Sequence, residues 1–391
     1  MRQSKVRSFT KKSAWVVMVI LCGILIFLAP ATAQENTQKP AAAKELVQIA
    51  ILLDTSGSME GLIEQAKSQL WKIVNEMALA KKKGASPQVE VALYEYGKDS
   101  IPASEGYLRM IVPLSTDLDK ISEELFKLTT NGGSEYCGQV IERATQSLQW
   151  AKSNDHLKVI FIAGNEPFTQ GAVEYKKSCK EAISKGIIVN TIFCGSFQEG
   201  IDTNWKDGAD LADGKYINID HNQVVVDIAA PQDAEIMALG KKLNETYVAY
   251  GTKGALSKTR QEAQDTNASS IAGSGAMVQR SVAKASKQYS NSGWDIVDAE
   301  KEGKVKVEEL DEATLPEEMK KMSTKERKDY IEKKTKERAA LQDKINTLRQ
   351  KRDQYIAAKQ KTSAEKTTLD AAVINAIKEQ AKKKNYKFEE K

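Results

Sequence analysis

The chain has 391 residues, enough for one sizeable core and a second region, and its formal net charge is +5. Basic and acidic residues are both abundant, and no aromatic residues interleave with a basic cluster, so the composition argues against a nucleic-acid-binding protein. With two histidines and no Cys-x-x-Cys pair, the usual ligand sets of a zinc site cannot be assembled.

The N-terminus predicts export. Basic residues precede an apolar run from Ala14 to Ala29, and Ala31-Thr32-Ala33 places small residues at the two positions that a signal peptidase inspects. The run is shorter than the ~20 apolar residues of a membrane span. We therefore expect cleavage after Ala33 and an exported protein of the periplasm or cell envelope. The alternative is an uncleaved anchor in the inner membrane, formed by residues 14–29.

A strand and a helix follow a short linker. Residues 34–45 are rich in Ala, Gln, Lys and Pro and are predicted to be that linker. Leu46–Leu53 is a mostly apolar run with β-branched residues, as in a strand buried on both faces. Apolar residues then recur at helical spacing from Leu62 to Met77. The loop between them lies where open α/β sheets bind ligands.

The alternation of strands and helices continues to about Ile228. Strands are predicted at 88–96, 108–114, 157–163, 186–194 and 215–219, and helices at 118–128, 137–152, 173–185 and 205–212. Strands that alternate with helices of this length indicate βαβ units. The predicted fold class is α/β, a doubly wound and mostly parallel sheet, followed by a charged, mainly helical C-terminal region.

The C-terminal region has a different composition. A helix is predicted at 236–250, whereas residues 251–292 contain few large apolar residues from which to build a core. From Leu315 onward the chain is rich in Lys, Glu and Arg and is predicted to be helical, and its last ten residues are expected to fray. Lys334, Arg338 and Arg352 interrupt its apolar seam. Both an imperfect coiled coil that binds a partner and a helix packed on its own domain fit this pattern.

Asp54, Ser56 and Ser58 form the first part of a candidate metal site. One carboxylate and two hydroxyls suit a hard divalent cation, because Mg²⁺ prefers oxygen donors and retains several waters. The alternative is a turn in which Asp54 or Ser56 caps the helix. Here the sequence resembles the von Willebrand factor type A domain family, whose metal-ion-dependent adhesion site is written Asp-x-Ser-x-Ser. The resemblance covers Leu46 to Ile228.

The resemblance implies that two further loops complete the site. Thr130-Asn131-Gly132-Gly133-Ser134-Glu135-Tyr136 matches the second loop and puts Ser134 at the position of the family's threonine, with Glu135 or Thr130 as alternatives. The third loop departs from the family's Asp-Gly, which is often followed by Glu-Pro. Gly164 stands at the aspartate position, and Asn165 and Glu166 are the available donors. The predicted metal ligands are Asp54, Ser56, Ser58, Ser134, Asn165 and Glu166.

Three cysteines remain after removal of the predicted signal, which contains Cys22. Cys137 and Cys194 are both expected at the carboxyl edge of the sheet, where they are candidates for a disulfide bridge, with Cys179 reduced on a helix. The alternative is three buried free thiols. The sequence does not decide between these alternatives.

The resemblance implies a metal-dependent protein-binding module, for adhesion or as a scaffold, and the predicted export signal places it in a bacterial cell envelope. Mg²⁺ (or Mn²⁺ or Ca²⁺) would keep open coordination positions, and an Asp or Glu side chain of another protein would fill one. No catalytic role is predicted, since the chain has neither a Gly-x-Ser-x-Gly elbow nor a phosphate-binding Gly-rich loop. The alternative is a structural envelope scaffold that acts through its helical tail and has a degenerate metal site.

The predicted domain organisation has five parts. They are a signal peptide (1–33), a linker (34–45), a von Willebrand factor type A domain (46–228), a helical and polar region of low hydrophobicity (229–314) and a charged helical or coiled-coil tail (315–391). Membrane contact is expected only through the N-terminal segment, if it is uncleaved.

Overall fold

A computed structural model describes residues 45–222, 227–271, 275–360 and 369–388. The predicted signal peptide, its alternative as a membrane anchor, and the linker up to residue 44 lie outside these residues. All the described residues belong to one compact unit. None of the helices in the described ranges is long and apolar enough to cross a membrane.

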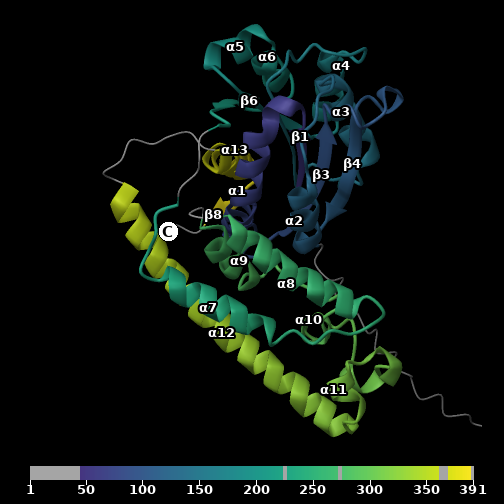
Figure 1. The fold of residues 1–391 in the computed structure, drawn as a ribbon, viewed down its shortest axis with the longest axis vertical. Coiled ribbons are helices and arrows are strands. Elements are labelled where there is room, and N and C mark those ends of the chain that lie inside the picture. The colour runs from purple at the N-terminus through teal and green to yellow at the C-terminus, as the bar shows by residue number, and fades with distance from the viewer. Residues whose placement is uncertain (1–44, 223–226, 272–274, 361–368, 389–391) are drawn as a thin grey trace, which may run out of the picture. The chain divides into compact units, whose positions relative to one another are not determined.

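A six-stranded sheet in the order β4-β3-β1-β5-β6-β7 is the centre of the first half of the chain (Figure 1). Only the β3–β4 pair is antiparallel, and the other neighbouring strands of this sheet run parallel. Its strands are β1 (Leu46–Asp54), β3 (Gln88–Tyr96), β4 (Leu108–Ser115), β5 (Leu157–Gly164), β6 (Ile188–Cys194) and β7 (Tyr216–Ile219). The predicted strands are found in the structure, and the predicted α/β class is confirmed.

Helices cover both faces of the sheet because β1 is apolar on both. Ile49 and Leu53 belong to one buried cluster, whereas Ala50 and Leu52 belong to the other, as the period of two in a strand requires. The first face carries α1 (Glu60–Ala78), α2 (Leu118–Lys127) and α13 (Leu369–Lys383); the second carries α3 (Cys137–Ser147), α4 (Tyr175–Ser184) and α6 (Trp205–Asp210), with α5 (Phe197–Asp202) beside them. We call this assembly the head.

The helices that follow residue 230 form a second layer against α1 and α2, which we call the helical region. They are α7 (Asp233–Asn244), α8 (Gly254–Ser270), α9 (Ala276–Lys284), α10 (Ile296–Lys301), α11 (Glu317–Lys320) and α12 (Thr324–Gln360). The polar segment 251–292 contains two of these helices, which its composition did not predict. Figure 1 shows α12 running alongside α7, and the two helices are in contact.

A buried arginine explains how such a polar segment packs. Arg280 of α9 has no exposed surface; it donates to Asp119 of α2 at 2.8 Å, and its guanidinium also pairs with Asp265 of α8. The guanidinium lies over the ring of Trp71 in α1, at 4.6 Å from the centroid. Lys284, one turn further along α9, donates to Asp265 at 2.6 Å. Charged side chains are therefore buried and paired between these helices.

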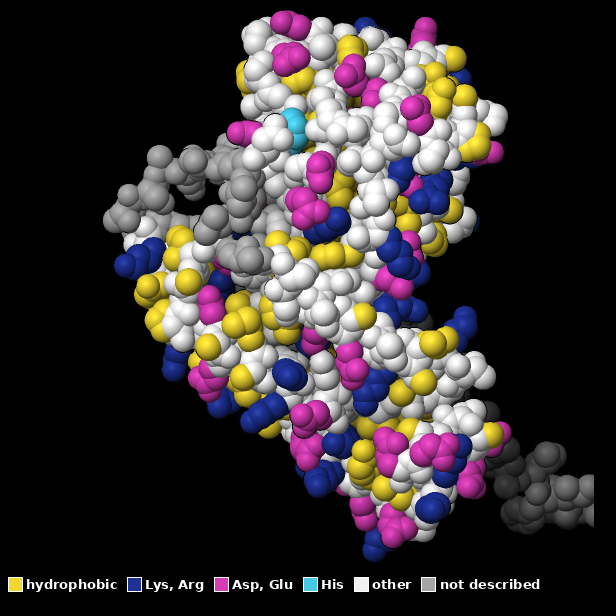
Figure 2. Space-filling view, viewed as in Figure 1, with side chains coloured by type: hydrophobic (Ala, Val, Ile, Leu, Met, Phe, Trp, Pro, Cys, Tyr) yellow, Lys and Arg dark blue, Asp and Glu magenta, His cyan; other side chains and the backbone are white. Residues whose placement is uncertain are grey.

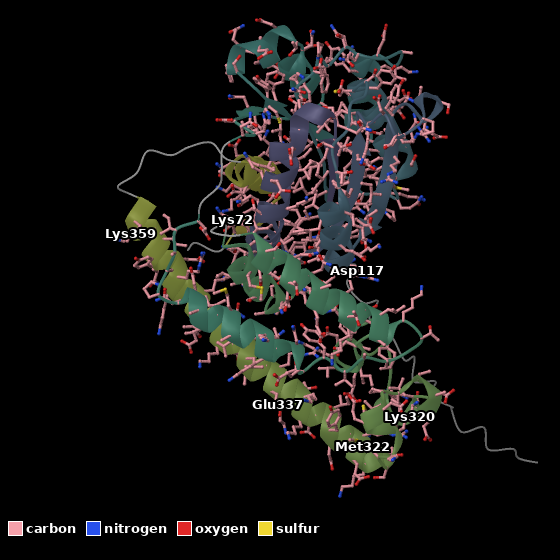
Figure 3. All side chains as sticks on the ribbon, in the orientation of Figure 1. Lys72, Asp117, Lys320, Met322, Glu337 and Lys359 are labelled. Atoms are coloured by element: carbon pink, nitrogen blue, oxygen red, sulfur yellow. The ribbon has the colours of Figure 1, made fainter. Side chains whose placement is uncertain are left out.

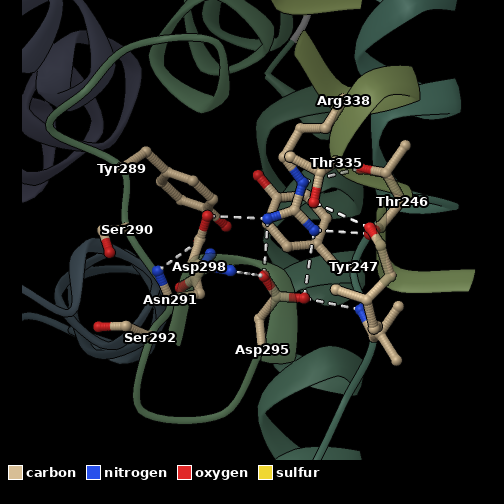
Figure 4. A network of polar contacts seen from close by, with 12 residues as sticks. Thr246, Tyr247, Tyr289, Ser290, Asn291, Ser292, Asp295, Asp298, Thr335 and Arg338 are labelled. Atoms are coloured by element: carbon tan, nitrogen blue, oxygen red, sulfur yellow. Dashed lines mark hydrogen bonds and ion pairs between the residues drawn. The ribbon is translucent and has the colours of Figure 1, made fainter. Parts of the chain in front are cut away.

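The arginines that interrupt the predicted seam of α12 are also buried. Figure 4 shows Arg338 between Asp295, Asp298 and Thr246: it lies 2.6 Å from Asp295 and 2.8 Å from Asp298, and it donates to the carbonyl of Thr246 at 2.6 Å. Arg352 pairs with two aspartates next to and within α7, Asp227 and Asp233. Ile345 and Leu348 of the seam are buried between these anchors, and Ile331 is buried ahead of Arg338. Of the two alternatives for this segment, the structure therefore shows a helix packed on its own chain.

The last described residues return to the head. On α13, Leu369, Val373 and Ile377 join the apolar cluster of the first sheet face. Lys72 of α1, labelled in Figure 3, pairs with Asp370 at 2.5 Å. The expected fraying is wrong for residues 382–388: Tyr386 is buried, and a short strand β8 (Lys387–Phe388) pairs antiparallel with β2 (Ala80–Lys81). A buried aromatic side chain anchors this end.

The outer surface of the helical region carries charged side chains of both signs. Figure 2 shows basic and acidic side chains interspersed over the helical region, with no large area of one sign. Asp117 at the start of α2, labelled in Figure 3, accepts a hydrogen bond from Arg260 of α8 at 2.8 Å. Such exposed pairs contribute little stability.

Candidate metal site

The first loop begins where β1 ends. Asp54 has no exposed surface, and its Oδ1 accepts a hydrogen bond from the backbone N–H of Ser56 at 2.7 Å. The hydroxyls of Ser56 and Ser58 lie 3.3 Å apart. Ser56 precedes a 3-10 turn (Gly57–Met59) that leads into α1, but its side chain makes no capping hydrogen bond. The carboxylate and both hydroxyls therefore share one turn, and Ser56 is not a helix cap.

The three predicted loops meet at this edge of the sheet. The N–H of Asn131 donates to the carbonyl of Thr55 at 3.0 Å, which ties the second loop to the first. The side-chain amide of Asn165 donates to Ser58 Oγ at 3.2 Å, which ties the third loop to the first. The structure thus brings Asp54, Ser56, Ser58 and Asn165 together.

The remaining two predicted ligands lie in the same loops with less direct contacts. Ser134 is half-buried in the second loop, and its hydroxyl makes no hydrogen bond to any residue in the described ranges. Glu166 is half-buried in the third loop, and its Oε2 accepts a hydrogen bond from Gln170 Nε2 at 3.2 Å. The negative charge of Glu166 contributes to the raised pKa of Asp54, after the larger effect of burial.

Glu135 in the second loop is the nearest other acid. Its side chain is 5 % exposed. A Cβ built on Gly97 would lie 2.7 Å from Asp54 Oδ1 and 2.9 Å from Glu135 Cγ, so both acids border the same glycine. Burial, followed by the charge of Glu166, raises the pKa of Glu135 to about 7. Its backbone N–H donates at 3.0 Å to Oε1 of Gln170, the residue that also binds Glu166.

Burial, together with the charges of the neighbouring acids Glu135 and Glu166, raises the pKa of Asp54 to about 8, although hydrogen bonds from Ser56 oppose the shift. Its Oδ2 is buried without a hydrogen-bond partner in the described part of the chain. No lysine or arginine there forms an ion pair with any of these three acids. A buried carboxylate without a counter-charge is costly. A divalent cation would supply the missing charge, so the residues present fit one.

At the family's aspartate position, Gly164, another residue fills the space that a side chain would need. A Cβ on Gly164 would lie 2.6 Å from the Tyr96 hydroxyl and 3.0 Å from Asp54 Oδ2. Tyr96 is fully buried, and its hydroxyl donates to the carbonyl of Ala163 at 2.9 Å. No side chain fits at Gly164 without moving Tyr96. The third loop therefore lacks the family's acid where the hydroxyl of Tyr96, from β3, fills the space beside Gly164.

The cysteines lie beneath the site. Cys137, Cys179 and Cys194 are all buried free thiols. Cys137 Sγ lies 3.9 Å from the Tyr96 hydroxyl. Of the two alternatives for these cysteines, the structure shows the free thiols, and burial raises the pKa of each one.

Two contributors to the site had no signal in the sequence. Gln170 lies beyond the Asn-Glu-Pro motif, in a turn that shows no ligand pattern, yet it connects the second and third loops. Tyr96 is one of several alternating residues of β3, and nothing in the sequence shows that its hydroxyl fills the place beside Gly164. Glu135 was recognisable only as an alternative to Ser134.

The family model of the von Willebrand factor type A domain matches residues 48–207, and the chain contains a domain of this family. Domains of this family are typically protein-binding modules without catalytic activity, and many depend on a metal ion. The resemblance inferred from the loops is confirmed. No curated protein sequence matches the chain.

Solved structures with similar folds come from several sources. The BatB protein of Bacteroides thetaiotaomicron matches with 17 % identity and a TM-score of 0.34, over 44 % of this chain and 90 % of that one. The mussel byssus protein PTMP1, with a zinc-occupied MIDAS motif, matches with 15 % identity and a TM-score of 0.35, over 46 % of this chain and 43 % of that one. The pilus adhesin SpaC of Lactobacillus rhamnosus GG matches with 15 % identity and a TM-score of 0.34, over 46 % of this chain and 28 % of that one.

Proposed function

We propose that this chain is a divalent-metal-dependent protein-binding module that docks an acidic side chain of another protein. One observation carries the proposal: Asp54 is fully buried, has an unpartnered oxygen within the described residues, and is surrounded by acids without a counter-charge. Such an arrangement is costly unless a cation is bound. The family to which the domain belongs supports the same conclusion.

The proposed ligands are those predicted from the sequence. Asp54, Ser56 and Ser58 supply the first three oxygens, with Ser134, Asn165 and Glu166 as the donors of the other loops. In the described residues no group of three or more His, Cys, Asp and Glu side chains is arranged to hold a metal ion, so hydroxyl or amide oxygens must take part. Oxygen ligands favour Mg²⁺, Mn²⁺ or Ca²⁺. When bound, the ion supplies a positive charge and an open coordination position for a carboxylate.

We also propose a cellular location, based on the N-terminal sequence. The charged, apolar and small-residue segments within residues 1–33 support export. We propose that the protein acts in the periplasm or cell envelope, with the segment 14–29 as an inner-membrane anchor if it is uncleaved. The partner is then another envelope protein with an exposed Asp or Glu.

Metal titration of the full chain tests the site. Calorimetry with Mg²⁺ and Mn²⁺ should show binding that is lost in Asp54→Asn, because the substituted amide carries no charge. Asp210→Asn is the matched control: Asp210 is an exposed aspartate of α6 that pairs only with Lys206, and this variant should bind as the unsubstituted protein does. Equal affinity of the Asp54 variant and the control would refute the site.

A second function has one observation in its favour. Because Gly164 cannot carry the family's aspartate, the metal site is degenerate in the sense that one acid is missing, as a scaffold acting through its helices would allow. Capture of envelope proteins by the full chain separates the two functions. Metal-dependent docking predicts capture that chelator and Asp54→Asn both abolish, whereas a scaffold predicts capture that neither changes. A head truncated near residue 228 is unsuitable for this test, since it lacks α13, which packs on α1.

A further inference from the structure

We propose that Glu135 is a direct ligand of the ion and takes over the role of the acid that the third loop cannot carry. This inference rests on the proposed function, because it concerns the same site. It differs from the ligand set predicted from the sequence, which places Ser134 at this point of the second loop. In place of the Ser134 hydroxyl, the Glu135 carboxylate lies beside Asp54.

Three observations put the Glu135 side chain at the ion. It is almost fully buried at the loop edge of the sheet, at 5 % exposure. It borders the same face of Gly97 as Asp54 Oδ1. Ser56, whose backbone N–H donates to Asp54, also lies beside the Glu135 side chain. A cation near these groups therefore contacts both acids.

The loop geometry holds Glu135 in this place. A Cβ on Gly133 would lie 2.5 Å from the carbonyl oxygen of Gly97, so the two glycine loops touch through their backbones. The N–H of Glu135 is held by Gln170 Oε1 at 3.0 Å. The second loop therefore cannot withdraw without breaking a backbone contact and a hydrogen bond.

Glu166 is the competing acid, and its contacts place it further out. Its Oε2 accepts the Gln170 amide at 3.2 Å, and its side chain is half-buried. In the described residues no three acids converge as a metal-binding group, so a pair of carboxylates with serine hydroxyls is what the geometry provides. The pair assigned here is Asp54 and Glu135.

Charge gives this assignment a consequence for the partner. With Asp54 alone, a divalent centre keeps one positive charge, whereas with Asp54 and Glu135 it is neutral. A neutral centre holds its ion more firmly and attracts an incoming carboxylate less. Glu135 therefore makes ion binding largely independent of the partner and keeps docking of an acid weak and reversible.

Manganese binding to the full chain tests the assignment. Mn²⁺ is titrated into the unsubstituted protein, Glu135→Gln, Glu166→Gln and Asp54→Asn, with free Mn²⁺ followed by electron paramagnetic resonance and bound water by proton relaxation. Because even partners of metal ligands contribute about 10–100-fold to metal affinity, Glu135→Gln should weaken binding by about tenfold or more. It should also add one exchangeable water to bound Mn²⁺. Glu166→Gln removes the half-buried acid of the third loop and should weaken Mn²⁺ binding less than Glu135→Gln does.

A carboxylate probe provides the second readout. At saturating Mn²⁺, acetate should bind more tightly to Glu135→Gln than to the unsubstituted protein, because the centre of the variant keeps a positive charge. A merely structural role of Glu135 would not produce this opposite effect on the two ligands. Glu135→Asp keeps the charge and should restore part of the Mn²⁺ affinity; circular dichroism of all variants in chelator checks that they fold.

The results distinguish failure of the Glu135 assignment from failure of the metal-dependent function. If Asp54→Asn abolishes Mn²⁺ binding but Glu135→Gln keeps the affinity and water number of the unsubstituted protein, Glu135 is not a ligand and the metal-dependent function stands. If Asp54→Asn binds Mn²⁺ normally, the proposed function fails and this inference fails with it. If the Glu135 and Glu166 variants exchange their expected results, Glu166 is the second acid and the assignment is overturned.

Discussion

The head and the helical region are held together by different forces. In the head, the two faces of the sheet are covered by apolar residues, and Ile160 and Ile162 at its centre have no exposed surface. The helical region also has buried apolar residues, but buried charged side chains lie among them, above all Arg280 and Arg338, each paired with two buried or partly buried aspartates. Apolar packing tolerates small rearrangements, whereas a buried ion cluster tolerates no missing member.

The comparison shows why the two regions differ in their sequences. A region without enough large apolar residues can still form a fixed structure if each buried charge has its partners. Such clusters add little net stability relative to apolar residues of the same volume, but they make a particular packing mandatory. Charge pairing thus adds to apolar packing in specifying the helical region, whereas hydrophobic pattern specifies the head.

The largest expected effect is at Arg280. Arg280→Met removes the cation that pairs with Asp119 and Asp265 and leaves two carboxylates without it in the interior, which should cost about 3–5 kcal/mol in unfolding free energy. Chemical denaturation followed by tryptophan fluorescence measures the loss. The exposed pair Lys336–Glu332 is the control, and Lys336→Ala should leave the unfolding free energy unchanged. Similar losses in both variants would show that the arginine cluster is not a structural centre.

The second effect asks whether α13 belongs to the head. Ile377 of α13 and Ile160 of β5 are both fully buried, and Ile377 packs in the cluster that contains β1 residues. Substitution of either by alanine should therefore cost about 2–5 kcal/mol. Denaturation of the two variants under the same conditions compares them. If Ile377→Ala lost less than about 1 kcal/mol, α13 would be an accessory of the head and not part of its core.

The third effect is a pH dependence confined to the head. The pKa of Asp54 is raised from 3.8 to about 8 in the folded protein, so in chelator the folded state holds a proton that the unfolded state has lost between these values. Stability should therefore fall as pH rises from 3.8 to about 8. If half of the shift is realised, the fall amounts to about 2–3 kcal/mol.

Unfolding in urea at several pH values in chelator measures this slope. Asp54→Asn should flatten it, because an amide does not titrate, and Mg²⁺ should oppose it by binding the ionised carboxylate. Glu135, whose pKa is raised to about 7 mainly by burial, contributes a smaller slope of the same sign. An unchanged slope in Asp54→Asn would assign the pH dependence to other groups.

The smallest effect concerns the space beside Gly164 in the third loop, which the Tyr96 hydroxyl fills. Gly164→Ala places a methyl group 2.6 Å from the Tyr96 hydroxyl, an overpacked contact that should cost about 1–3 kcal/mol. Tyr96→Phe removes that hydroxyl, so the double variant should lose less than the sum of the two single variants. Thermal unfolding of the four proteins gives the coupling energy. Strict additivity would mean that Tyr96 does not close this position.

The sequence predicted the head well because hydrophobic pattern controls it. The apolar runs of β1 and β5 and the order of the three loops all follow from local rules, and the structure confirms them. The chemistry of the loops was less accessible. Whether Ser134 or Glu135 faces Asp54 depends on the contact between the backbones at Gly97 and Gly133, which no spacing reveals.

The helical region could not be predicted in the same way. Hydrophobic periodicity treats Arg338 and Arg352 as interruptions of a seam, although both are buried members of it. Their aspartate partners lie far away in the sequence: Asp295 is 43 residues from Arg338, and Asp227 is 125 residues from Arg352. The helices α8 and α9 were not predicted for the same reason, since their buried positions carry glutamine, lysine and arginine.

The return of α13 to the head has a consequence for biosynthesis. Lys378 of α13 reaches Glu76 of α1, 302 residues earlier in the chain. During synthesis, the part of the first sheet face that α13 covers therefore stays exposed until α13 has left the ribosome. Long-range closure of this kind slows folding and exposes an apolar surface to aggregation. A chaperone that shields nascent or translocating chains should improve the yield of the intact protein.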